Sequence, residues 1–168
     1  MQSAELFWIE GPWPGKLALA ARPRGGEWLE DEMVAWHSAG VDSVLSLLTK
    51  DEEVDLCLAN ESTVVRAHSM KFLSLPIEDR QVPRSPTELA KTIEELEDDL
   101  SKGRNVVIHC RQGVGRSGLV GACLMIGKGL DAKTAIERLS AGRGVAVPET
   151  VEQRQWIDYY AGSLAGIR

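Results

Sequence analysis

Residues 106–118 read VVIHCRQGVGRSG, and this stretch decides both the fold and the candidate site. An apolar run, typical of a buried strand, leads into a cysteine, three glycines, two arginines and a serine. A structural turn needs one or two of these glycines, but it needs neither a cysteine at its start nor an arginine shortly after it. The pattern therefore indicates a loop with a chemical task.

Cys110 is the first residue of the expected loop. Gly113 and Gly115 permit positive φ values, so successive backbone N–H groups can turn inward and form a cradle for an anion. A helix expected to begin near Ser117 would add its unpaired N-terminal amides. A cysteine in this setting is expected to be a thiolate at neutral pH, and the planar guanidinium of Arg116 suits two phosphate oxygens. The loop therefore predicts nucleophilic attack on a phosphoryl group.

This loop differs from the nucleotide-binding loop that holds magnesium. That loop needs Gly-Lys-Ser/Thr, and the lysine is absent from residues 110–118. We therefore expect no metal ion and no cofactor. The structural alternative for Cys110 is a core cysteine at the end of a strand, because cysteine is often buried. The arginine and the glycines at this spacing argue against that alternative.

The composition is that of an ordinary globular protein, with 168 residues, 43% hydrophobic and 26% charged. The length fits one domain over residues 1–168. No apolar run is long enough to insert into a membrane, and MQSAELFWIEGPWPGK at the start does not read as a secretory signal. The three widely spaced cysteines disfavour disulfides and a zinc site. We expect a cytoplasmic protein with reduced thiols, and the net charge of −6 argues against a nucleic-acid partner.

Apolar runs and helical periodicity alternate along the chain. Strands are expected within residues 16–23, 41–49, 70–76 and 105–110. Helices are expected within residues 27–40, 51–60, 86–103, 117–129, 131–142 and 148–164. This alternation predicts an α/β fold with a central, mostly parallel sheet flanked by helices. Ligands of such sheets bind beyond the carboxyl ends of the strands, where the loop after residue 109 lies.

The segment from His109 to Ser117 resembles the H-C-x5-R-S/T signature of the cysteine-based protein tyrosine phosphatase superfamily. Domain size and element order resemble the compact dual-specificity group, especially its kinase-associated and atypical branches. Low-molecular-weight tyrosine phosphatases carry a related motif at the extreme N-terminus, so the position of Cys110 argues against them. The resemblance covers most of the chain, strongly over residues 72–160, and implies a protein tyrosine phosphatase-like fold.

The resemblance implies a role for each residue of the signature. Cys110 would be the nucleophile, and Ser117 would hydrogen-bond its sulfur and help it to leave. His109 would order the loop and help to keep the thiol ionised. The phosphate would be held by the loop residues Arg111, Gln112, Gly113, Val114, Gly115 and Arg116. The Arg111 side chain is expected to point outward and add positive potential at the rim.

The family takes its general acid from an aspartate on a separate upstream loop, and LPIEDRQVP, residues 75–83, fits that place. Asp79 matches the family's Pro-Ile-x-Asp pattern and would later act as base in hydrolysis of the phosphocysteine. The adjacent Glu78 is the alternative acid. Near the C-terminus, ETVEQRQWIDYY resembles the segment whose glutamine positions the hydrolytic water. Gln153 matches best, and Gln155 is the alternative. In the family an Arg-Pro-Gly sequence precedes this segment, whereas this chain has GRGVAVPET there.

The stretch ARPRGG contains two candidates for a substrate rim, Arg22 and Arg24. In compact relatives, the loop after the corresponding strand lies beside the mouth of the active site. Both arginines could therefore meet acidic or phosphorylated substrates. An ordinary surface turn is an equal alternative.

These features predict a metal-independent protein tyrosine or dual-specificity phosphatase acting on phosphorylated proteins. No obvious long loop is available to build a deep pocket, so phosphoserine and phosphothreonine are expected beside phosphotyrosine. The phosphoinositide-selective branch typically carries lysines in the loop, and Arg111, Gln112 and Val114 disfavour that substrate. A phosphoprotein-binding pseudophosphatase would usually have lost Cys110, Arg116 or the acid. A sulfur-transfer or arsenate-reducing enzyme, which also uses a cysteine in an anion-binding loop, is the third alternative.

Overall fold

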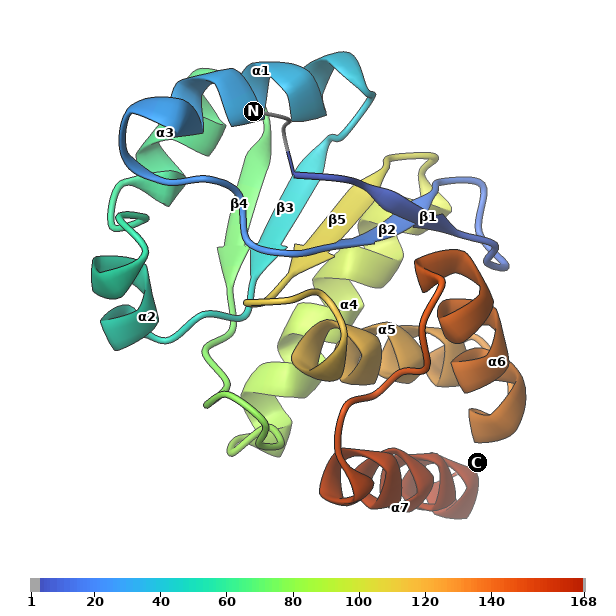
Figure 1. Ribbon diagram of the computed structural model, residues 1–168. Helices are drawn as coiled ribbons and strands as arrows, with labels where there is room; N and C mark the ends of the chain where they lie inside the picture. Colours follow the sequence, from blue (N-terminus) through green and yellow to red (C-terminus); the bar gives the residue numbers. More distant parts are fainter. Residues whose placement is uncertain (1–3, 168) are drawn as a thin grey trace.

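The computed structural model describes residues 4–167 of the protein. Within these residues, a five-stranded sheet lies between two layers of helices (Figure 1). Its inner strands are short runs of buried, mostly apolar side chains, as expected for a sheet covered on both faces. The strands are β1 (Phe7–Ile9), β2 (Leu17–Ala20), β3 (Ser43–Ser46), β4 (Lys71–Ser74) and β5 (Val106–His109).

The strand order is β1-β2-β5-β3-β4, and β2, β5, β3 and β4 run parallel. Ile108 of β5 pairs with Leu19 of β2 on one side and with Leu45 of β3 on the other. This mostly parallel sheet confirms the fold class that the sequence predicted. The sequence analysis missed β1, which is antiparallel to β2. A strand of three residues is too short to show a periodic signal.

Helices cover both faces of the sheet. In Figure 1, α1 and α3 lie on one side of it, and α4 to α7 lie on the other. The helices are α1 (Leu29–Ser38), α2 (Lys50–Asp55), α3 (Glu61–Ala67), α4 (Pro86–Ser101), α5 (Gly115–Gly127), α6 (Ala132–Arg143) and α7 (Val151–Ile167). Among the described residues, no helix combines the length and the apolar character that crossing a lipid bilayer requires.

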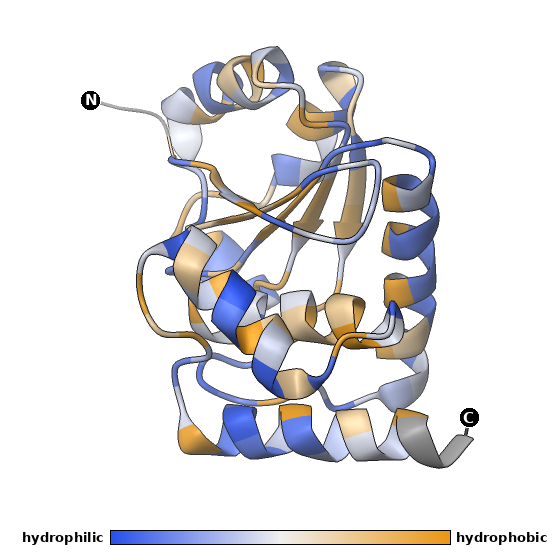
Figure 2. Cartoon of the chain, turned by 90° about the vertical axis from the view of Figure 1, so that its right-hand side faces the viewer, coloured by the Kyte–Doolittle hydropathy of each residue, from blue (hydrophilic) through white to orange (hydrophobic). Residues whose placement is uncertain are grey.

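Two apolar cores result, one on each face of the sheet. In the smaller core, Met33 and Trp36 of α1 pack with Val44 and Val107 of the sheet. The larger core surrounds α5, which is buried along almost its whole length and contacts α4, α6 and α7. Figure 2 shows the apolar strands enclosed by helices with hydrophilic outer surfaces. The start of α5, where the candidate site lies, is therefore held rigidly.

Side-chain caps set the helix starts that flank the site. The Ser85 hydroxyl accepts a hydrogen bond from the N–H of Glu88 and so caps the start of α4. Thr49 and Glu52 form a full capping box at the start of α2. The single helix expected over residues 51–60 was wrong, because α2 ends early and α3 follows it as a separate helix.

Candidate active site

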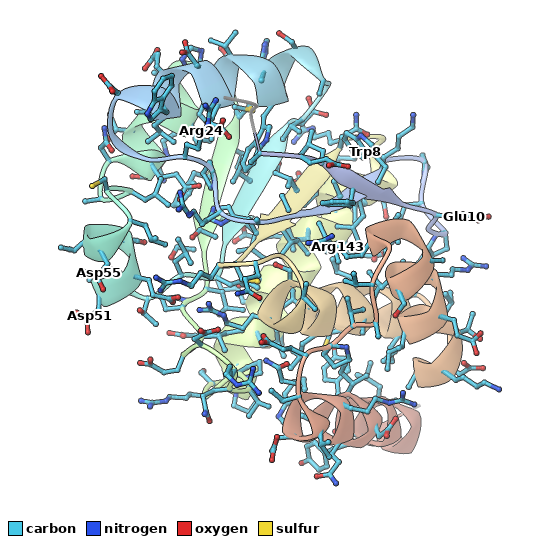
Figure 3. The ribbon with its side chains drawn as sticks, viewed as in Figure 1. Trp8, Glu10, Arg24, Asp51, Asp55 and Arg143 are labelled. Carbon is cyan, nitrogen blue, oxygen red and sulfur yellow. The ribbon has the colours of Figure 1, made fainter. Side chains whose placement is uncertain are left out.

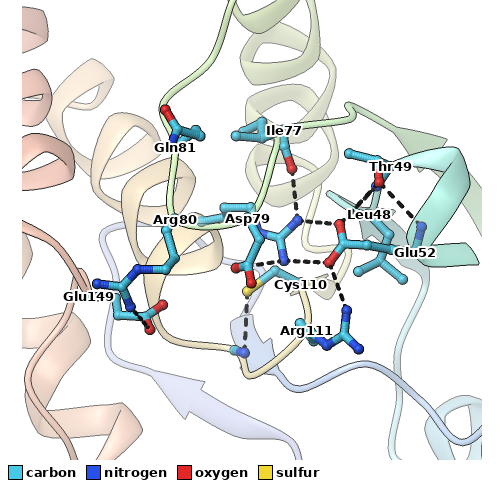
Figure 4. A network of polar contacts seen from close by, with 12 residues as sticks. Leu48, Thr49, Glu52, Ile77, Asp79, Arg80, Gln81, Cys110, Arg111 and Glu149 are labelled. Carbon is cyan, nitrogen blue, oxygen red and sulfur yellow. Dashed lines mark hydrogen bonds and ion pairs between the residues drawn. The ribbon is translucent and has the colours of Figure 1, made fainter. Parts of the chain in front are cut away.

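Three chain segments meet at the carboxyl edge of the parallel strands. The loop after β5 begins at Cys110, the chain after β3 enters α2 at Thr49, and the chain after β4 carries Asp79. Neighbouring parallel strands end at the same edge of a sheet, so these segments converge. Figure 4 shows their side chains facing one another. The structure thus brings together residues that lie far apart along the chain.

Gly113 gives the loop its shape. Its φ of 73° lies in the left-handed region, and a Cβ built there would lie 2.5 Å from the backbone carbonyl carbon of Ala20. Glycine meets both conditions, because it tolerates positive φ and has no side chain to collide with β2. The loop is therefore packed against the end of β2. In this position the N–H of Gly113 donates to Sγ of Cys110 at 3.3 Å.

Arg143, at the end of α6, holds the outer side of the loop. Its Nε donates to the carbonyl of Gly113 at 3.0 Å, and its Nη2 donates to the carbonyl of Gln112 at 3.1 Å. The guanidinium also lies 3.9 Å from the ring centroid of Phe7 in β1 (Figure 3). In a planar trans peptide, the C=O and N–H groups point in opposite directions. The two bonds therefore turn the amides of Gly113 and Val114 inward.

Arg116 lies in the first turn of α5, and its side chain is almost fully buried. Its Nη1 donates to Oε1 of Glu52 at 2.6 Å and to the carbonyl of Ile77 at 2.7 Å. Its Nη2 donates to Oε2 of Glu52 at 2.9 Å and to Oδ1 of Asp79 at 3.1 Å (Figure 4). Burial acts to lower the pKa of Arg116, but the hydrogen bond to Glu52 and the surrounding negative charges raise it. The site therefore contains a fixed cation.

Glu52 is a site residue that the sequence analysis missed. Its Oε1 accepts a hydrogen bond from the N–H of Thr49 at 3.1 Å, and the Thr49 hydroxyl accepts one from the N–H of Glu52 at 3.3 Å. Burial acts to raise the pKa of Glu52, but hydrogen bonds from Arg116 and Thr49 outweigh it and leave the pKa lowered. Thr49-x-x-Glu52 is a capping-box pattern readable from sequence, but that pattern does not point to Arg116.

Asp79 reaches the site from the loop after β4. Its carboxylate is half exposed and lies 3.1 Å from Nη2 of Arg116. The alternative acid, Glu78, is exposed, and its carbonyl accepts the N–H of Gln81 at 3.0 Å. Of these two adjacent carboxylates, Asp79 is the one that contacts Arg116.

His109 is fully buried directly before Cys110. Its Nε2 lies 2.6 Å from Oε2 of Glu61, the first residue of α3. Because a carboxylate only accepts hydrogen bonds, Nε2 of His109 is the donor. The ring also lies 6.1 Å from the ring of Trp36 in α1. Sequence reasoning missed Glu61, because no local pattern links the start of α3 to the end of β5.

The helix expected to begin near Ser117 is α5, which begins two residues earlier, at Gly115. Ser117 is fully buried, and its Oγ has no hydrogen-bond partner among residues 4–167. The expected hydrogen bond from Ser117 to Sγ of Cys110 is therefore not formed in this structure. Cys123 lies further along the same helix, where complete burial raises the pKa of its thiol. That environment suits a structural cysteine rather than a nucleophile.

Gln153 lies at the start of α7 and is fully buried, whereas the alternative, Gln155, is exposed. Its Oε1 accepts hydrogen bonds from the N–H groups of Glu149 and Thr150, both at 3.2 Å. Its Nε2 donates to the carbonyl of Gln81, in the loop that carries the candidate acid, at 3.0 Å. The amide of Gln153 thus borders the site with both polar ends engaged.

The two candidate rim residues, Arg22 and Arg24, have different surroundings in the structure. The N–H of Arg22 donates to the carbonyl of Arg111 at 3.3 Å, so this part of the chain lies beside the loop. The side chain of Arg111 is 43% exposed, and its Nη1 lies 3.6 Å from Glu52. Arg24 instead forms an ion pair of 2.6 Å with Glu32, a buried residue of α1 (Figure 3). Arg22 and Arg111 therefore border the site, whereas Arg24 is bound to α1.

Comparison with known proteins agrees with this geometry. A family model described as PTP-SAK, Swiss Army Knife protein, DSP-PTPase phosphatase domain, matches residues 6–155. The chain belongs to this family. It is a dual-specificity-type phosphatase domain of the cysteine-dependent protein tyrosine phosphatase superfamily. This membership confirms the resemblance that residues 109–117 carry.

Related proteins and structures support the same family. The cyclin-dependent kinase inhibitor 3 proteins of Homo sapiens and Sus scrofa are 33% and 28% identical over 130 residues. Each alignment covers 76% of this chain, which spans only 61% of either relative. A crystal structure of kinase associated phosphatase, its catalytic-site cysteine substituted by serine, aligns with a TM-score of 0.86 at 22% identity over 98% of both chains. Tk-PTP in its active form aligns with a TM-score of 0.74 at 26% identity, over 94% of this chain and 96% of that one.

Proposed function

We propose that the protein hydrolyses phosphomonoesters as a protein tyrosine or dual-specificity phosphatase, with Cys110 as its nucleophile. One observation carries the proposal: the guanidinium of Arg116 donates to Asp79 at 3.1 Å and lies close enough to Cys110 for their charges to interact. A nucleophile, an anion-binding cradle and an acid are the groups that transfer of a phosphoryl group to sulfur requires.

The first step transfers the phosphoryl group to the enzyme. The thiolate of Cys110 attacks phosphorus, so that an S–P bond forms and the P–O bond to the leaving group breaks. Asp79, protonated at this point, gives its proton to the leaving oxygen. Arg116 and the inward amides of Gly113 and Val114 stabilise the negative charge on the remaining phosphate oxygens.

The hydrogen bonds of Arg116 support this assignment. A guanidinium has five N–H groups, and within residues 4–167 Glu52, Ile77 and Asp79 accept four of them. The fifth N–H group, at Nε, and the Nη2 N–H group that donates to Asp79 are the two donors that can bind two oxygens of a phosphate. An arriving phosphate therefore displaces Asp79 from Arg116. The freed carboxyl group can then hold the proton that the leaving oxygen needs.

The second step regenerates the enzyme. Water attacks the phosphocysteine, the S–P bond breaks, and Asp79 accepts the proton of the water. Gln153 is the candidate for placing this water, because its amide borders the loop of Asp79 through the carbonyl of Gln81. Ser117 is the candidate for stabilising the departing sulfur of Cys110, because its buried hydroxyl still has a hydrogen bond to offer.

Phosphorylated proteins are the substrate class that we propose. Arg22 and Arg111 beside the loop favour anionic segments. The half-exposed carboxylate of Asp79 indicates a shallow site, which admits phosphotyrosine and also phosphoserine or phosphothreonine. Phosphoinositides are the alternative, and the lack of lysine between residues 110 and 117 disfavours them. A thiolate nucleophile needs a reducing compartment, so we place the reaction in the cytoplasm.

Hydrolysis of para-nitrophenyl phosphate by wild type and Cys110→Ser, with EDTA and a reductant present, tests the proposal. We expect activity in wild type and at least about a thousandfold less in the variant. Comparable activity in the two proteins would exclude Cys110 as the nucleophile. A folded, reduced wild type that binds phosphopeptides without hydrolysing them would instead indicate a pseudophosphatase. Phosphopeptides and phosphoinositide vesicles, compared on the active enzyme, then separate the two substrate classes.

A further inference from the structure

The loop that carries Asp79 is tied to the start of α7 at two points. Nη1 of Arg80 lies 2.6 Å from Oε1 of Glu149. Nε2 of Gln153 donates to the carbonyl of Gln81 at 3.0 Å. The two residues that follow the candidate acid are therefore both anchored to the segment around the start of α7, and Figure 4 shows the pair of Arg80 with Glu149.

The two side chains that tie the acid loop, those of Glu149 and Gln153, also lie beside the start of α5. A Cβ built on Gly115 would lie 3.0 Å from Oε1 of Gln153 and 3.0 Å from Oε2 of Glu149. The two side chains therefore occupy the space beside the first residue of α5 that a side chain at this position would need. Glu149 therefore contacts both halves of the site, the acid loop and the phosphate loop.

The backbone conformation of the acid loop explains why it needs such a tie. Arg80 has a φ of 63°, in the left-handed region that residues with a Cβ seldom adopt. A residue keeps this conformation where its surroundings hold it there. The hydrogen bond from the N–H of Gln81 to the carbonyl of Glu78 links residues of one turn. The ion pair of Arg80 with Glu149 instead joins segments that lie far apart in the chain.

We propose that Arg80 and Glu149 form a latch that positions Asp79 over the nucleophile. The latch rests on the proposed function, since its role lies in the proton transfer of that reaction. Both are positioning residues, because they act through the backbone next to Asp79. Their side chains are 59% and 29% exposed, and an exposed ion pair contributes little to folding stability. Loss of the latch is therefore expected to change the loop and not the fold.

The test compares Arg80→Gln and Glu149→Gln with wild type on two aryl phosphates. The ratio kcat/KM covers the steps up to departure of the leaving group, which include the proton transfer from Asp79. For phenyl phosphate, a poor leaving group, we expect kcat/KM to fall about tenfold in each variant. For para-nitrophenyl phosphate, a much better leaving group, we expect a loss of about twofold or less. Asp79→Asn sets the upper limit and is expected to lose more on phenyl phosphate than either latch variant.

The chain offers matched controls for both halves of the latch. Arg84 is exposed in the same loop as Arg80, and Glu152 is exposed in the first turn of α7, shortly after Glu149. Arg84→Gln and Glu152→Gln should keep the kcat/KM of wild type on both substrates. The double variant with Arg80→Glu and Glu149→Arg re-forms the ion pair with its charges exchanged. We expect it to recover a large part of the activity that the single variants lose on phenyl phosphate.

Hydrogen exchange tests the latch without turnover. In both latch variants we expect faster exchange over residues 77–82 and unchanged exchange in Val106–His109, because only the loop is released. Unchanged exchange over residues 77–82, or equal losses on both aryl phosphates in an active enzyme, would overturn the latch alone. An inactive wild type would overturn the proposed function together with the role of the latch in proton transfer.

Discussion

Both carboxylate oxygens of Glu52 accept hydrogen bonds from the guanidinium of Arg116, at 2.6 and 2.9 Å. Glu52 belongs to α2 after β3, and Arg116 belongs to α5 after β5, so the pair joins the ends of two neighbouring strands. Two parallel N–H···O bonds fix the plane of a guanidinium as well as its position. Among residues 4–167 no acceptor takes the Nε–H of Arg116, and we propose this group as a donor to a substrate phosphate.

Glu52→Gln is expected to weaken the binding of phosphate. An amide offers one acceptor oxygen in place of two and carries no charge, so Arg116 loses its fixed plane. We expect the KM for para-nitrophenyl phosphate to rise about tenfold. Asp51→Asn, exposed in the same helix, is the control and should leave KM unchanged. An unchanged KM in Glu52→Gln would contradict the role of this pair.

The same carboxylate predicts how stability depends on pH. The pKa of Glu52 lies below its ordinary value of 4.5 in the folded protein, so the unfolded chain binds the proton more readily. The stabilisation from this group is therefore present above about pH 5 and is lost as the pH falls through the lowered pKa. In wild type, the free energy of unfolding should fall more steeply below about pH 5 than in Glu52→Gln. Denaturant unfolding at a series of pH values measures this difference. If the free energy of unfolding changed with pH in the same way in both proteins, Glu52 would not be the source of the pH dependence.

Arg143→Lys is expected to weaken the anion cradle while keeping its charge. A lysine cannot donate to the carbonyls of Gln112 and Gly113 with the fixed geometry of a guanidinium, so the amides opposite lose their inward orientation. We expect the Kd for tungstate, measured by calorimetry in a Cys110→Ser background, to rise about tenfold. Lys133→Arg, exposed on the same helix, is the control. Equal affinities in all these proteins would show that Arg143 does not organise the loop.

Gly113→Ala is expected to disrupt the loop because of both its conformation and its surroundings. The new Cβ would meet the backbone of Ala20 at 2.5 Å, and φ is positive. We expect the free energy of unfolding to fall by about 3 kcal/mol and phosphatase activity to be lost. Gly129→Ala isolates the conformational part, since Gly129 has a φ of 108° and no atom within 4 Å of its Cβ position. That control should lower the free energy of unfolding by about 1 kcal/mol. Equal losses in the two variants would show that the contact with Ala20 does not contribute to the effect of Gly113→Ala.

The phosphate loop and its strand were predictable because their signal is local. Cys110, Gly113 and Arg116 lie within a few residues of one another, and an apolar strand before a glycine-rich turn fixes their relative positions. The alternation of strands and helices also predicted the sheet and most of its helices. Asp79 could be selected over Glu78 through resemblance alone, and the structure adds the contact of Asp79 with Arg116.

The partners that hold the loop could not be predicted, because they come from distant elements. Glu52 reaches Arg116 only because β3 and β5 are neighbours in the sheet, and Arg143 reaches the loop only because α6 packs beside it. Glu61 likewise meets His109 through the packing of α3. A single sequence shows the capping box of Glu52 but not the register that brings its side chain to the site. Pairings of this kind follow from tertiary packing, which one sequence does not display.

In the reaction that we propose, the phosphoryl group is carried by the sulfur of Cys110. Wild type and Cys110→Ser can each be mixed with para-nitrophenyl phosphate, denatured within the first turnovers, and digested for mass spectrometry of the peptide that contains residue 110. We expect a phosphoryl group on Cys110 in wild type and none on this peptide in the variant. A phosphoryl group on a different residue of the active wild type, or full turnover by Cys110→Ser, would exclude Cys110 as the nucleophile.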